Sequence, residues 1–139
     1  MSARKIAAVL SLSGALTMSL HTEPAGATAA SVEGAWAGDQ LQLRIDGQGG
    51  HIETGCAHGH IIGPIKLAAD GKFTASGTFQ VHRGGPQRAD EAAEPAPAAR
   101  FSGEVKDGLM RLEILPKGAA APEVFRLRSG ARIKLIRCL

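Results

Sequence analysis

The chain has 139 residues, of which 21% are charged, and a formal net charge of +3 at pH 7. This length allows one domain with a modest core, and the small net charge excludes a polyanion binder that depends on bulk charge alone. There is no tyrosine, and the four phenylalanines fall at predicted core positions. The sequence therefore has no aromatic platform for stacked bases, and we expect no nucleic-acid partner.

The first 27 residues have the order of a secretory signal peptide. Arg4 and Lys5 precede an apolar run over 6–20, a polar patch follows, and Ala25-Gly26-Ala27 supplies small residues for cleavage. The run of about 15 residues is shorter than the roughly 20 that a membrane-spanning helix needs. We expect cleavage after Ala27, with Ala29 as the alternative. A single mature domain, residues 28–139 without a transmembrane segment, would then be periplasmic or secreted.

The mature chain shows period-two alternation from residue 40 onward. Residues 40–46 alternate polar and apolar, a glycine-rich turn follows, and 51–56 return as a second strand. Residues 64–67 read as a short strand and 72–82 as the longest one. Gly77 in the middle of that strand predicts a bulge or a close approach of another backbone. Trp36, ahead of the first predicted strand, is expected to plug one end of the core, with a ligand platform as the alternative.

A segment without periodicity divides the strands into two groups. Residues 83–98 are rich in Gly, Pro, Ala and charge and predict a mobile loop. Strands at 101–105 and 110–114 flank Asp107-Gly108, the strongest hairpin signal in the chain, and strands at 124–128 and 131–139 end it. About eight short strands without helical periodicity predict an all-β fold. We expect a small antiparallel meander barrel, with a two-sheet β-sandwich as the alternative.

The order of several short motifs resembles a group of small exported bacterial proteins, usually described as hypothetical. The motifs are CAHG at 56–59, GP at 63–64, GTF at 77–79, HRGGP at 82–86, ARFSG at 99–103 and the terminal RCL. The resemblance covers nearly all of the mature chain, and its CAHG and terminal CL positions are the specific ones. It implies a single exported domain and no particular mechanism.

Two cysteines in an exported chain predict one disulfide, Cys56–Cys138. The bond would join the turn after the second strand to the final strand and so close the barrel at its seam. A disulfide would also consume the only thiolate nucleophile, and no serine lies in a G-x-S-x-G elbow. We therefore do not expect an enzyme.

Metal binding is the alternative reading of the same stretch. Cys56, His58 and His60 would point to one side of an extended chain, and with Cys138 they would make an S₂N₂ set suited to zinc or copper. A histidine-only copper site, in which His51 or His82 joins the other histidines, is a further possibility. The expected disulfide argues against the thiolate site, and Gly59 makes a regular strand doubtful there. The main expectation is no cofactor.

Basic residues concentrate at the C-terminus. Arg126 and Arg128 share one face of a predicted strand, and Arg132 and Lys134 share one face of the next. The four charges would merge into a patch for an acidic protein or an anionic envelope component, or else form a solvated outer face. With His58 and His60 they are the candidate binding residues. The sequence thus favours a small secreted or periplasmic binding module, and analogy at the level of the fold adds an inhibitor-like role.

Overall fold

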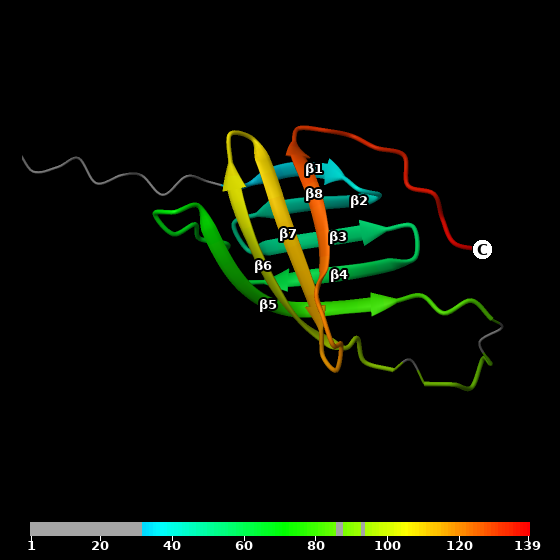
Figure 1. Ribbon diagram of the computed structural model, residues 1–139. Coiled ribbons are helices and arrows are strands. Elements are labelled where there is room, and N and C mark those ends of the chain that lie inside the picture. The colour runs from blue at the N-terminus through cyan, green and yellow to red at the C-terminus, as the bar shows by residue number, and fades with distance from the viewer. Residues whose placement is uncertain (1–31, 86–87, 93) are drawn as a thin grey trace, which may run out of the picture.

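The computed structural model describes residues 32–139 except 86, 87 and 93. Its eight strands form one closed antiparallel barrel in which each strand pairs with the next and β8 returns to β1 (Figure 1). The prediction of an all-β meander barrel is confirmed. The expected signal peptide and its cleavage site lie outside the described residues. The strands are β1 (Gly34–Gly38), β2 (Leu41–Asp46), β3 (Gly49–Thr54), β4 (Ala57–Ile62), β5 (Lys72–Val81), β6 (Ala98–Lys106), β7 (Leu109–Pro116) and β8 (Glu123–Ser129).

The predicted number of strands agrees with the structure, but two of the predicted positions are wrong. Residues 64–67 and 131–139 form no strand, whereas β1 and β4 were not predicted. The sequence of β1, GAWAG, has one large apolar side chain, and β4 turns Ala57 and Gly59 inward. Where the inward residues are this small, the sequence lacks the alternation of large apolar and polar side chains that predicts a strand. Residues 131–139 have no strand edge to pair with, because β8 already pairs with β1.

Packed apolar side chains fill the barrel interior. Inward positions alternate with exposed ones along β2 and β7, and three of the four phenylalanines are buried. Trp36 lies within β1 rather than ahead of it, and its indole nitrogen donates a buried hydrogen bond to Val32 O at 2.8 Å. Among the described residues no polar side chain is buried. The interior is therefore an apolar core. Its largest fully buried members are Val32, Leu41, Leu43, Ile52, Phe101, Met110, Leu112, Ile114 and Leu127.

Two tight turns set the register of neighbouring strands. Asp107-Gly108 joins β6 to β7 with φ values of 51° and 74°, which confirms the predicted hairpin. Asp39-Gln40 joins β1 to β2 with φ values of 46° and 59°. Both central residues of each turn are left-handed, as in type I′ turns, whose twist matches that of the strands. The described part of the chain contains no helix that could cross a membrane.

The barrel closes at a short seam between β1 and β8. Two residue pairs form there, Trp36 with Ser129 and Ala37 with Arg128, and Gly130 N–H donates to Ala35 O at 2.8 Å. At the other end of the seam the Arg126 backbone N–H donates to the Asp39 carboxylate at 2.7 Å. The Asp39 side chain thus takes the place of a backbone acceptor and extends the seam.

Removing the Asp39 carboxylate is expected to weaken the seam. Asp39→Ala should lower the free energy of unfolding by about 1–2 kcal/mol, because it leaves the Arg126 N–H without its acceptor and puts alanine at positive φ. Asp39→Asn is the matched control, since asparagine keeps an acceptor and tolerates this φ. Urea denaturation measures both variants. Equal stability of Asp39→Ala and the wild type would contradict this role for the carboxylate.

Candidate functional site

The disulfide joins the β3–β4 turn to the end of the chain. Cys56 and Cys138 are bonded, with Cα atoms 5.2 Å apart, inside the usual range for a disulfide. The predicted pairing is confirmed, but its predicted place at the seam is wrong, because the seam lies between β1 and β8. The bond instead fastens a C-terminal tail, residues 130–139, to the outside of the barrel.

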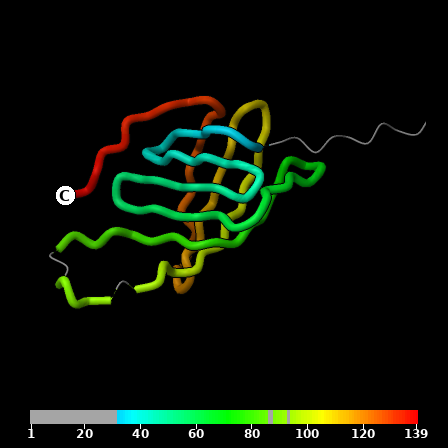
Figure 2. Tube along the Cα trace, turned by 180° about the vertical axis from the view of Figure 1, so that it is seen from behind, coloured from blue at the N-terminus to red at the C-terminus, as the bar shows by residue number. Residues whose placement is uncertain are grey.

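The C-terminal tail is held to the barrel by a few polar contacts. Gln42 Nε2 donates to Ile133 O at 2.6 Å, Ile136 N–H donates to Gln40 Oε1 at 3.4 Å, and Cys138 N–H donates to Gly55 O at 3.1 Å. Figure 2 shows the tail leaving β8 and ending beside the β3–β4 turn. Two of these three hydrogen bonds use a glutamine side chain of the barrel in place of a backbone partner, and the tail forms no strand.

The predicted CAHGH stretch forms a regular strand, contrary to our expectation for Gly59. Residues 57–62 are β4, with Gly59 buried. A Cβ atom on Gly59 would lie 2.8 Å from Thr78 O and 2.9 Å from Phe79 Cδ2. Glycine at this position makes room for the Phe79 ring. Gly77 likewise leaves no space for a side chain beside the backbone of His60, which confirms the predicted close approach.

All four histidines of the described chain gather on the outer face of β3, β4 and the end of β5. His58 and His60 point outward from β4, His51 is opposite His60 in register on β3, and His82 follows β5. His58 Nδ1 and His82 Nε2 are 3.0 Å apart and share a hydrogen bond. The His51 and His60 ring centroids are 4.6 Å apart, and those of His58 and His60 are 6.5 Å apart.

The predicted ligand set of Cys56, His58 and His60 does not assemble. The Cys56 sulfur is bonded to Cys138, and neither described cysteine is free. Within residues 32–139, apart from the three positions left undescribed, no group of three His, Cys, Asp or Glu side chains is placed to hold a metal ion. His58 and His82, a pair that the sequence offered only as an alternative, have ring nitrogens 3.0 Å apart.

The predicted basic patch is divided into two parts. Arg126 and Arg128 are exposed on β8, as expected. Arg132 and Lys134 lie in the C-terminal tail rather than on a neighbouring strand. Arg132 lines a second groove of about 490 Å³, between the tail and the outer face of β1–β3. The prediction of one patch of four charges on two neighbouring strands is therefore wrong.

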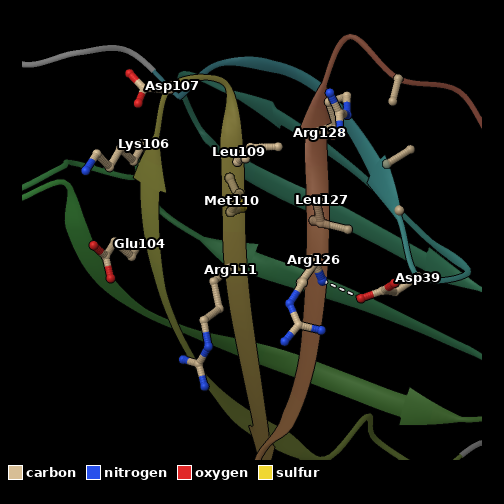
Figure 3. A pocket seen from close by; sticks show the side chains of 13 residues that line it. Asp39, Glu104, Lys106, Asp107, Leu109, Met110, Arg111, Arg126, Leu127 and Arg128 are labelled. Carbon is tan, nitrogen blue, oxygen red and sulfur yellow. Dashed lines mark hydrogen bonds between the residues drawn. The ribbon is translucent and has the colours of Figure 1, made fainter.

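A groove of about 620 Å³ surrounds the β8 arginines (Figure 3). It runs over the outer face of β6, β7 and β8 and reaches the β1–β2 turn and the start of the tail. Arg111 on β7 is directly opposite Arg126, and Leu109 is directly opposite Arg128. We call this feature the arginine groove. Its lining is Ala37, Gly38, Asp39, Glu104, Lys106, Asp107, Leu109, Met110, Arg111, Arg126, Leu127, Arg128 and Ala131.

The three arginines of this groove differ in their partners. Arg111 forms an ion pair with Glu113 on the same strand. In the described chain the guanidinium groups of Arg126 and Arg128 make neither an ion pair nor a hydrogen bond, although the Arg126 backbone is held by Asp39. In Figure 3 the Arg111 and Arg126 side chains extend from neighbouring strands on the same side of the sheet. Two cationic groups are thus free to meet an anionic ligand.

Sequence reasoning missed Arg111, Leu109 and Asp39 as parts of this site. The alternation over 110–114 already places Arg111 outward, and the Asp107-Gly108 turn pairs it with Glu104 on β6. The pairing of Arg111 with Arg126 depends on the β7–β8 register. No two-residue turn signal sets that register, because residues 117–122 join the two strands.

The predicted loop at 83–98 lies between β5 and β6, and β6 begins at Ala98. The described residues of 83–97 form no strand, and Glu91 N–H donates to Arg88 O at 3.1 Å in a turn. The loop lines neither groove in the described chain.

Comparison of the chain with protein families, with curated proteins and with solved structures finds no match.

Proposed function

We propose that the protein is a secreted or periplasmic binding module whose arginine groove takes up an acidic segment of a partner protein. The observation that carries this proposal is the placement of Arg111 directly opposite Arg126 on the outer face. Like charges directly opposite each other destabilise a sheet. Arg111 has its own counter-charge in Glu113. Arg126, directly opposite it, and Arg128 have none in the described chain, which is typical of a surface whose counter-charge comes from a ligand.

The shape and the apolar part of the groove favour a peptide segment over an isolated anion. Leu109 is 50% exposed and lies directly opposite Arg128, and the small residues Ala37 and Ala131 also line the groove. A volume of about 620 Å³ is in the range of sites that hold a small ligand or a few side chains. Carboxylates would pair with Arg126 and Arg128 while an apolar side chain covers Leu109.

The disulfide supports the proposed location. Disulfides form and persist in oxidising compartments, and this bond is present in the structure. The proposed binding needs no cofactor and no catalytic step. An anionic envelope lipid would also present negative charge to Arg126 and Arg128. It has no acidic side chains on a peptide, so experiment can distinguish a lipid from a peptide partner.

Charge reversal in the groove tests the proposal. The double variant Arg126→Glu/Arg128→Glu should weaken binding of a fluorescent hexaglutamate peptide by about tenfold or more, because each lost ion pair contributes on the order of 1 kcal/mol. Fluorescence anisotropy at two salt concentrations is the measurement, and higher salt should weaken the wild type. Urea denaturation confirms that the variant is folded.

Arg132→Glu/Lys134→Glu is the matched control, since it changes the net charge equally but lies in the tail. This control should bind the peptide nearly as well as the wild type. Equal losses in both double variants would mean bulk charge rather than a site and would reject the proposal. Binding to phosphatidylglycerol vesicles but not to the peptide would assign the arginines to the envelope lipid instead.

A further inference from the structure

The histidine patch lies away from the arginine groove and calls for a separate explanation. It consists of His51, His58, His60 and His82 on β3, β4 and the end of β5, whereas β6–β8 form the wall that crosses in front of these strands in Figure 1. Neither the proposed peptide binding nor the core requires these side chains, because they point away from the interior.

The geometry of one pair within this patch is suited to a metal ion. His58 Nδ1 and His82 Nε2 are 3.0 Å apart, and their rings are inclined by 34°. Two nitrogens bound to one ion at about 2.0–2.1 Å, with an angle of about 90–110° between them, lie about 2.8–3.4 Å apart. The observed separation falls inside that interval. We infer that His58 and His82 are two ligands of a binding site for a divalent transition-metal ion, Cu²⁺ or Zn²⁺.

The backbone holds both ligands in place before any ion arrives. His58 is in β4, and its neighbour Ala57 pairs with Val81, the residue before His82. The His82 N–H donates to Cys56 O at 2.7 Å and so continues the β4–β5 pairing by one step. Cys56 is itself fastened by the disulfide. Because the two imidazoles start from paired backbone beside a covalent link, little conformational freedom is lost on binding.

Solvent supplies the remaining ligands, because no third His, Cys, Asp or Glu side chain of the described chain is placed to bind the same ion. Water would complete the coordination of an ion held by two imidazoles. Imidazole nitrogen suits both zinc and copper, and Cu²⁺ binds a given nitrogen site more tightly than Zn²⁺. The site uses no thiolate, so it is compatible with an intact disulfide.

The inference is tested on the disulfide-bonded mature protein, purified without a histidine tag. Titration with CuCl₂ by calorimetry should give one tight site per chain and a weaker isotherm with ZnCl₂. Either His58→Gln or His82→Gln should reduce the Cu²⁺ affinity by at least about tenfold, the smallest effect usually seen when even an indirect metal partner is lost. His51→Gln is the matched control and should keep wild-type affinity.

A second measurement uses the unmodified chain, so that the inference does not depend on the folding of any variant. Substoichiometric Cu²⁺ should broaden the imidazole NMR signals of His58 and His82 before those of His51. Equal broadening of all four histidines, or equal loss of affinity in His51→Gln and His82→Gln, would show nonspecific imidazole binding and overturn the site. Failure of the wild type to bind one Cu²⁺ per chain would overturn it as well. Neither result depends on the arginine groove.

Discussion

The Cys138→Ser variant is expected to lose about 2–5 kcal/mol of its free energy of unfolding, as is typical when a small secreted domain loses a native disulfide. Cys56 and Cys138 are separated by 82 positions, and the chain-entropy argument gives about 4–5 kcal/mol for a loop of that size. The tail joins no strand, so the folded variant regains some freedom when its end detaches. The measured loss should therefore fall below the full entropic value. Urea denaturation under non-reducing conditions gives the number.

The same variant should keep its barrel. Strand β8 pairs with β1 without any help from the disulfide. In the described chain Gly130 N–H donates to Ala35 O, and residues 133, 136 and 138 hold the rest of the tail with one hydrogen bond each. We expect an unchanged far-ultraviolet circular dichroism spectrum together with faster proteolysis of the tail. The double variant Cys56→Ser/Cys138→Ser is the control for the free Cys56 thiol of the single variant. Its stability should equal that of the single variant. Loss of strand signal at room temperature would mean that the disulfide closes the barrel after all.

Replacing Phe101 by alanine is expected to lower the free energy of unfolding by about 3–5 kcal/mol. Phe101 points inward from the middle of β6, is 0% exposed, and lies opposite Ala75 on β5 and Ile114 on β7. The ring is packed on all sides by a core with no buried polar group in the described chain. Truncation would leave a cavity that the closed sheet cannot easily collapse into. Thermal and urea denaturation measure the loss.

Ile62→Ala provides the matched control for Phe101→Ala. Ile62 is also a large apolar side chain within a strand, but it points outward from β4 and is 71% exposed. Its truncation should change stability by no more than about 0.5 kcal/mol. Similar losses from the two variants would mean that the barrel interior is not the main source of stability.

Local patterns in the sequence were sufficient for the fold class. Alternation along residues 40–46 and 72–82 predicts strands with one buried face, because successive side chains of a strand point to opposite sides. Asp107-Gly108 predicts its hairpin because those residues adopt the left-handed conformation that the turn requires. The disulfide followed from the number of cysteines together with the predicted export of the chain. Each of these features depends on neighbouring residues or on composition alone.

The candidate sites depended on pairings between distant residues, which only the tertiary structure decides. His82 meets His58 because β4 pairs with β5 in one register, and a shift by one residue would turn one of them to the other face. Arg111 meets Arg126 through the β7–β8 register. The sequence by itself determined an all-β chain and the outward face of Arg111, Arg126 and Arg128 on their predicted strands. The closed barrel decided which of them are neighbours, because β1 takes the edge of β8 and leaves residues 131–139 outside the sheet.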